Sequence, residues 1–208
     1  MRIAVFGATG RIGSAVVAEA RARGHEVTPV VRRDRPAVLA GVANVVADLD
    51  DPATVRAACA GQDVVVSAIG WRPEESEDLL ARAARVLVDA VRTTGTRLVI
   101  VGGAGTLMTP TGLFIDSPDF PAERRRNSLT QVAALDELRR HDPAGWTYLC
   151  PPAVIGPGER IGRYRLGTDR MLADAAGPAR ISIVDYAGAV VDLATAADPV
   201  SGHRTVAY

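Results

Sequence analysis

A short apolar run that passes directly into three regularly spaced glycines most constrains how this chain can fold. Ile3 to Phe6 is followed by Gly7, Gly10 and Gly13, and an amphipathic stretch begins at once. This order predicts a strand, a tight turn and a helix. Such an arrangement presents backbone N–H groups and the positive end of a helix to a phosphate group.

Each glycine of this turn has a separate expected role. Gly7 permits the sharp turn, Gly10 lets a pyrophosphate approach the backbone, and Gly13 lets the helix pack closely on its strand. The spacing G-x-x-G-x-x-G differs from the G-x-G-x-x-G form, and three glycines alone would also suit an ordinary turn. Their position between a strand and a helix is what predicts dinucleotide binding. The same turn contributes three further expected cofactor contacts, Thr9, Arg11 and Ile12.

Strands and helices alternate along the whole chain, which predicts an α/β fold with a single Rossmann-type, doubly wound parallel sheet and helices on both faces. Residues 1–208 are expected to form one NAD(P)-binding domain, because no linker or repeat interrupts them. The expected strands are 3–6, 26–31, 42–47, 64–67, 98–101, 146–150 and 203–208. Helices are expected to follow Gly10 and Asp51, to span about 79–91 and 123–140, and to run from Ser182 to about 196.

Charge and cysteine content exclude several classes of function. Lys+Arg and Asp+Glu both total 24, so no basic surface for nucleic acid is predicted, and no apolar run is long enough to cross a membrane. The early first strand leaves no room for a signal peptide. Two distant cysteines, Cys59 and Cys150, indicate neither a disulfide framework nor a metal site. We therefore expect a cytoplasmic protein without a metal, and a homodimer is left open.

The basic residues are all of one kind. Every one of the 24 is arginine, and the chain has no lysine. This composition excludes Schiff-base catalysis, a Walker-type phosphate lysine and a lysine-assisted proton relay.

In a doubly wound sheet the ligand lies across the carboxyl ends of the strands. Arg32 and Arg33 follow the second strand, and Arg11 lies on the same side. Arginine at this point favours the 2′-phosphate of NADP(H), whereas a carboxylate would favour the 2′-hydroxyl of NAD(H). The pattern therefore predicts a preference for NADP(H), with NAD(H) as the alternative. The other interpretation is that both arginines are solvated charges neutralised by Asp34.

The remaining strand ends supply the rest of the predicted cofactor site. Asp48 and Leu49 are expected to touch the adenine, and small or rigid residues after later strands are expected to line the ribose and nicotinamide. Those later residues are Ala68, Ile69, Gly70, Gly102, Gly103, Pro151, Pro152, Ala153 and Val154. Tyr164 is a candidate proton donor, with loop packing as the alternative. The long segment 106–120 is expected either to wall a substrate pocket or to pack on the C-terminal part.

Six segments spread over nearly the whole chain resemble one family. They are residues 7–13, 101–105, 116–121, 146–152, 157–164 and 181–187. On these segments the chain resembles an atypical short-chain dehydrogenase/reductase, and is similar to the small bacterial NADH-flavin reductases and the flavin/biliverdin-reductase type. The resemblance implies an NAD(P)-binding fold and a reductase activity.

The chain departs from that superfamily at the catalytic positions. The helix that usually carries Y-x-x-x-K reads Asn127 to Gln131 here, and Gly102 and Gly103 replace the usual serine or threonine after the fifth strand. A positioned proton donor contributes about 10²–10⁴ in rate, so a sugar-nucleotide epimerase or dehydratase is disfavoured.

Two functions remain after this departure. The first is a reductase that passes hydride to a flavin- or quinone-like acceptor, which needs no such acid. The alternative is a non-catalytic NADP(H)-binding redox sensor that acts through a protein partner.

Overall fold

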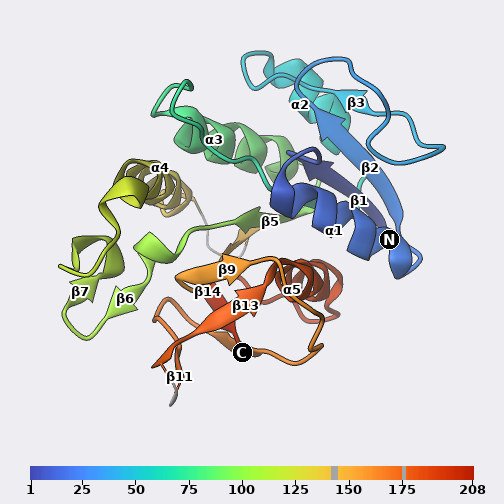
Figure 1. Ribbon diagram of the computed structural model, residues 1–208. Helices are drawn as coiled ribbons and strands as arrows, with labels where there is room; N and C mark the ends of the chain where they lie inside the picture. The colour runs from blue at the N-terminus through green and yellow to red at the C-terminus, as the bar shows by residue number, and fades with distance from the viewer. Residues whose placement is uncertain (142–144, 175–176) are drawn as a thin grey trace.

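The centre of the molecule is a twisted eight-stranded sheet (Figure 1). The computed structural model describes residues 1–141, 145–174 and 177–208. The strands are β1 (Arg2–Phe6), β2 (Glu26–Val31), β3 (Val45–Val46), β4 (Val64–Ser67), β5 (Arg97–Val101), β8 (Trp146–Cys150), β10 (Arg165–Gly167) and β14 (Gly202–Ala207). Their spatial order is β10-β14-β8-β5-β4-β1-β2-β3. Every neighbouring pair is parallel except β10 with β14, which confirms the Rossmann-like α/β fold.

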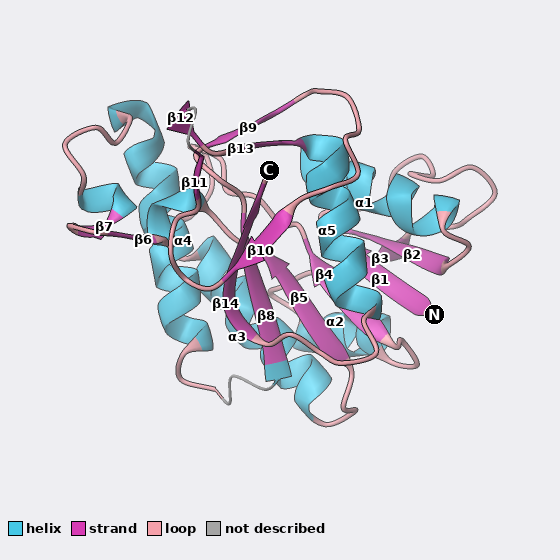
Figure 2. Ribbon diagram, turned by 90° about the horizontal axis from the view of Figure 1, so that it is seen from below, coloured by secondary structure: helices cyan, strands magenta, loops and turns pink. Residues whose placement is uncertain are grey.

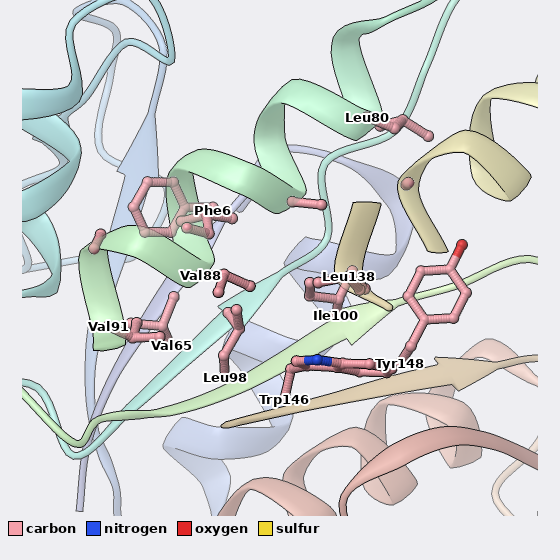
Figure 3. Close-up of a cluster of buried hydrophobic side chains, with 14 of the residues drawn as sticks. Phe6, Val65, Leu80, Val88, Val91, Leu98, Ile100, Leu138, Trp146 and Tyr148 are labelled. Atoms are coloured by element: carbon pink, nitrogen blue, oxygen red, sulfur yellow. The ribbon is translucent and has the colours of Figure 1, made fainter. Parts of the chain in front are cut away.

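Helices cover both faces of this sheet, as the alternating pattern predicts (Figure 2). The helices are α1 (Arg11–Ala22), α2 (Pro52–Cys59), α3 (Leu79–Arg92), α4 (Ala122–Leu138) and α5 (Ile183–Thr195). One core lies between the sheet and α1 with α5, and the other lies between the sheet and α2, α3 and α4. Figure 3 shows the second core, where Phe6 and Val65 of the sheet meet Val88 and Val91 of α3.

Three helix ends have the local causes that the sequence indicates. The Asp51 carboxylate accepts a hydrogen bond from the backbone N–H of Ala53 at 3.1 Å, directly before a proline that opens α2. Ser182 accepts one from the N–H of Asp185 at 3.2 Å and begins α5. Gly24 adopts a φ of 80° after α1, a conformation that favours glycine.

Several elements differ from the expectation. The third strand contains only Val45–Val46 instead of residues 42–47. Small ladders outside the main sheet are added by β6 (Met108–Thr109) with β7 (Gly112–Leu113), β9 (Val154–Gly156) with β13 (Arg180–Ser182), and β11 (Ala173–Asp174) with β12 (Gly177–Pro178). Two short 3₁₀ turns, η1 (Ala104–Thr106) and η2 (Phe114–Asp116), lie in the long segment after β5. Elements of two or three residues carry too little periodicity to be recognised in a sequence.

None of the helices within the described residues has the length and hydropathy needed to cross a bilayer. No cluster of His, Cys, Asp or Glu suited to a metal ion occurs in the same residues.

The buried Asp185 carboxylate ties the loop after β9 to α5. It is 1% exposed and accepts hydrogen bonds from the N–H groups of Ile161 (2.7 Å) and Gly162 (3.0 Å) and from the Tyr208 hydroxyl (2.7 Å). Burial raises the pKa of this carboxyl group, but the hydrogen bonds outweigh burial and leave the pKa below its ordinary value. The carboxylate therefore stabilises the fold at neutral pH.

We expect Asp185→Asn to lower the free energy of unfolding at pH 7 by about 1–3 kcal/mol, because buried donors lose an ionised acceptor. A depressed pKa gives stability that is complete above the unfolded value of about 4 and is lost as the pH falls through the folded value. The difference from the wild type, measured by urea unfolding, should therefore shrink below pH 4. Asp198→Asn, at an exposed position, is the control. A difference that stays constant with pH would contradict this account.

Candidate cofactor and acceptor cleft

A cleft of about 1070 Å³ lies at the carboxyl ends of the parallel strands. Its lining comes from the segments that follow β1, β2, β3, β4, β5 and β8, together with the start of α4. The site is where the fold rule for doubly wound sheets predicts it. The volume is slightly above the usual range of about 300–1,000 Å³ for small-molecule sites.

The structure brings nearly all the predicted cofactor residues together in this cleft. The lining includes Gly7, Thr9, Gly10, Arg11, Ile12, Arg32, Arg33, Asp48, Leu49, Ala68, Ile69, Gly70, Gly102, Gly103, Pro151, Pro152 and Ala153. Two predicted residues are not in the lining. Gly13 packs against the turn, where an added Cβ would lie 2.1 Å from the Gly7 carbonyl oxygen. Val154 pairs with Arg180 in the small ladder of β9 and β13, and is 51% exposed.

The glycine turn is shaped for close approach of a phosphate. Gly7 has a φ of 73° and accepts a hydrogen bond from the Gly10 N–H at 2.9 Å. Gly10 precedes α1 without a side-chain cap, and the first turn of the helix has no acidic residue. The turn thus leaves the helix N-terminus open to the cleft, where Arg11 adds a positive charge. These residues fit the diphosphate of a dinucleotide.

The end of the cleft beside β2 is rich in charge, and one of its members was not predicted. The lining here includes Arg32, Arg33, Asp34 and Arg35, and also Glu75 from the segment after β4. Arg32 Nη1 lies 3.5 Å from Glu75 Oε1. The acidic partner of Arg32 is therefore Glu75, whereas the sequence suggested Asp34. No local signal could identify it, because 43 positions separate the two residues.

The opposite end of the cleft is less polar. Phe114 and Phe120, from the long segment after β5, line it and contact each other edge to face, with ring centres 5.0 Å apart. This segment therefore forms a pocket wall, and the backbone of its Met108 also hydrogen-bonds to Asp169 and Met171 of the C-terminal part, so both expected roles occur. Arg124 at the start of α4 donates from Nη1 to the Ala153 carbonyl oxygen at 3.0 Å. This hydrogen bond joins α4 to the segment that follows β8.

The α4 positions that correspond to the superfamily's catalytic residues do face the cleft. Asn127 and Gln131 both line it, with Ser128 between them. The Gln131 side-chain oxygen accepts a hydrogen bond from the buried Tyr148 hydroxyl at 2.5 Å. Gln131 is thus committed to the packing of β8 against α4, and no lysine or tyrosine occupies either catalytic position.

The glycines after β5 have a tertiary cause. A Cβ on Gly102 would lie 2.5 Å from Cε1 of Tyr148 and 2.8 Å from the Cys150 sulfur, and one on Gly103 would lie 3.0 Å from Cγ of Gln131. A serine or threonine side chain therefore has no room at position 102. The packing of Tyr148 and Cys150 beneath the cleft therefore requires glycine at position 102, where the resemblance implies a serine or threonine.

A polar cluster lies under the same glycines. The Thr106 hydroxyl is 3.2 Å from the Cys150 sulfur, and His203 Nε2 is 3.3 Å from that sulfur. Burial raises the pKa of Cys150 to about 12 and lowers the pKa of His203 to about 4. Both groups are neutral at physiological pH, so Cys150 is not a thiolate nucleophile.

The candidate proton donor Tyr164 lies elsewhere. Its hydroxyl donates to the Asp192 carboxylate of α5, and its ring packs in the core shared by α1 and α5. It does not line the cleft. Burial and the Asp192 carboxylate hold its pKa above the ordinary value. The structure therefore places Tyr164 in a packing position away from the cleft, which is the alternative given for it.

Comparison with known proteins agrees with this geometry. The model of a family described as NAD(P)H-binding matches residues 7–197. The uncharacterized protein YwnB of Bacillus subtilis is 36% identical over 197 residues, which cover 92% of this chain and 91% of YwnB. A 3-diazoavenalumate denitrifying reductase from a Streptomyces species is 32% identical over 183 residues, covering 78% of this chain and 59% of that protein.

A solved structure shows the same fold over the whole chain. SP1627 of Streptococcus pneumoniae, described as a candidate NADH-flavin reductase, matches with a TM-score of 0.88 and 30% identity, covering 100% of this chain and 99% of that one. The family model spans almost the entire sequence, and YwnB is similar over nearly its full length. The chain therefore belongs to the NAD(P)H-binding family of atypical short-chain dehydrogenase/reductases.

Proposed function

We propose that this chain is an NAD(P)H-dependent reductase that prefers NADPH and reduces a flat conjugated acceptor, such as a flavin or a quinone, without a proton relay from the protein. The acceptor end of the cleft carries this proposal. Among the described residues that line the cleft from α4 and the segment before it, only Arg124 is ionisable. A guanidinium stays charged at all physiological pH values and is no proton donor.

The chain's own residues would supply position and exclusion of water. The bound nicotinamide supplies the hydride. The glycine turn holds the diphosphate, Arg32 and Arg33 hold the 2′-phosphate, and Phe114 with Phe120 gives an apolar wall for a ring. Conjugated rings accept hydride readily and take the proton from water. The proposal is also supported by two relatives, one described as a candidate NADH-flavin reductase and the other as a 3-diazoavenalumate denitrifying reductase.

Steady-state oxidation of NADPH and NADH tests this function. FMN, riboflavin and a simple quinone are the acceptors, and a sugar nucleotide and a simple ketone are the controls. We expect protein-dependent turnover with a conjugated acceptor and none with the controls. We also expect only a small solvent deuterium isotope effect on kcat, because no side chain transfers a proton. Absence of turnover above the protein-free rate with all acceptors would refute the reductase.

The missing acid also favours a second candidate, the non-catalytic NADP(H) redox sensor. That function predicts nucleotide binding without turnover, and a protein partner that one redox form of the nucleotide releases. A pull-down carried out with NADP and with NADPH separates it from the reductase.

Arg32→Ala tests the cofactor preference. We expect NADPH affinity to fall by about 10–100-fold, because a charge-assisted hydrogen bond contributes about 1.5–3 kcal/mol, while NADH affinity changes less than about threefold. Fluorescence titration of both nucleotides measures the effect. Arg56→Ala, at an exposed position of α2 outside the cleft lining, is the control. Equal losses for both nucleotides would show that Arg32 does not bind the 2′-phosphate.

A further inference from the structure

The segment between β4 and α3 carries a carboxylate to the end of the cleft that holds the arginines after β2. Glu75 lines the cleft, and its Oε1 atom is 3.5 Å from Arg32 Nη1. The side chain of Glu75 is only 18% exposed, whereas that of Arg32 is 59% exposed. An ion pair with so exposed a partner contributes little to stability. The pair can therefore be exchanged at little cost when another anion reaches Arg32.

Glu75 is held in place by its own segment. Its Oε2 atom accepts a hydrogen bond from the Arg72 N–H at 3.0 Å. The Trp71 indole donates to the carbonyl oxygens of Glu75 at 3.2 Å and Ser76 at 3.1 Å. These contacts close a compact turn around the glutamate. The carboxylate is consequently presented to Arg32 in a defined position.

Helix α4 braces the same turn from the other side. The Arg126 guanidinium lies over the Trp71 ring, 5.0 Å from its centre, and Arg126 Nε is 2.8 Å from a carboxylate oxygen of Glu77. The turn is thus joined both to α4 and to the residue after β2. Glu75 is the one carboxylate in this turn that lines the cleft, among the described residues.

We propose that Glu75 sets the balance between NADP(H) and NAD(H). Its carboxylate pairs with the Arg32 guanidinium that would bind the 2′-phosphate. The negative charge of this carboxylate also repels the bound phosphate. With NAD(H), the same carboxylate is the acceptor that suits a ribose 2′-hydroxyl. Arg32 and Glu75 therefore favour opposite cofactors, and the chain discriminates less than its arginines alone would. This inference rests on the placement of the 2′-phosphate at Arg32 proposed above, and not on the identity of the acceptor.

The test is a set of binding titrations with NADPH and with NADH. We expect Glu75→Gln to bind NADPH about tenfold more tightly and NADH about threefold more weakly. Glutamine keeps an oxygen that can accept the Arg72 N–H, and a thermal melt verifies the fold. In an Arg32→Ala background the gain for NADPH should fall below about threefold, because the group for which Glu75 competes is gone.

Glu74→Gln is the matched control. It makes the same change of charge at the neighbouring position, which is exposed and outside the cleft lining, and it should leave both affinities unchanged. Equal effects of Glu74→Gln and Glu75→Gln would overturn the inference, since they would indicate only a long-range effect of charge.

The outcomes also separate this inference from the proposed function. If Arg32→Ala weakens NADPH selectively while Glu75→Gln leaves the ratio of affinities unchanged, the role of Glu75 is refuted and the 2′-phosphate site stands. If Arg32→Ala weakens both nucleotides equally, the 2′-phosphate site fails, and the role of Glu75 fails with it.

Discussion

Gly13→Ala should lower the free energy of unfolding by about 3 kcal/mol or more, which is at the upper end for overpacked sites. It should also abolish nucleotide binding. An added Cβ would lie 2.1 Å from the Gly7 carbonyl oxygen and 2.8 Å from its carbon. Both are backbone atoms, so no side-chain rotation can relieve the overlap. The start of α1 would have to move away from β1, and the phosphate-binding turn would open. Urea unfolding and titration with NADPH measure the two effects.

Two further glycines make this prediction specific. Gly145→Ala should leave the unfolding midpoint unchanged within error, because a Cβ there meets no atom of the described residues within 4 Å. At Gly10 the nearest atom is the Gly7 oxygen at 3.3 Å. We expect Gly10→Ala to change stability less than Gly13→Ala, and to weaken the nucleotide through loss of close approach. A Gly13→Ala protein with wild-type stability would refute the packing role.

The combined variant Asn127→Tyr and Gln131→Lys should lose stability instead of acquiring dehydrogenase activity. Gln131 is 8% exposed, and its side-chain oxygen pairs with the Tyr148 hydroxyl at 2.5 Å. A lysine there would bring an ammonium group into the packed layer between α4 and β8. The group that the Gln131 side chain meets there is the Tyr148 hydroxyl, not a carboxylate. We expect a loss of about 2–4 kcal/mol, since a buried unpaired charge is expensive.

Thermal unfolding and reduction of a simple ketone by NADPH measure the outcome. Asn127→Tyr alone is the control, because position 127 is exposed and tolerates a larger side chain. The single variant should melt close to the wild type. A double variant that reduces ketones at wild-type stability would show that only two residues separate this chain from an ordinary dehydrogenase.

Much of the fold follows from local signals. The boundaries of β2, β4 and β8 match the predicted ranges, since each is a short run rich in the β-branched or aromatic residues that favour strands. The position of the cleft was predictable for a related reason. Once the strands are known, the residues at their carboxyl ends must meet at one edge of the sheet, and the observed cleft is lined by those residues.

Two features of the structure have no local signal in the sequence. Tyr164 follows a proline- and glycine-rich loop in the sequence, but its hydroxyl donates to the Asp192 carboxylate of α5. The edge strand β10 contains three residues and pairs with β14 in the antiparallel sense. Neither outcome has a local pattern, because each depends on a partner distant in the sequence.

The glycine turn and the absence of lysine can be read directly from the chain. They specify a dinucleotide site and exclude the Tyr/Lys relay, because backbone freedom at a turn and the type of an ionisable group are properties of single residues. The reason for Gly102 could not be read this way, nor could the pairing of Arg32 with Glu75. Only folding brings Tyr148 beneath Gly102 and the Glu75 carboxylate beside Arg32. Both contacts depend on residues that are far apart in the sequence.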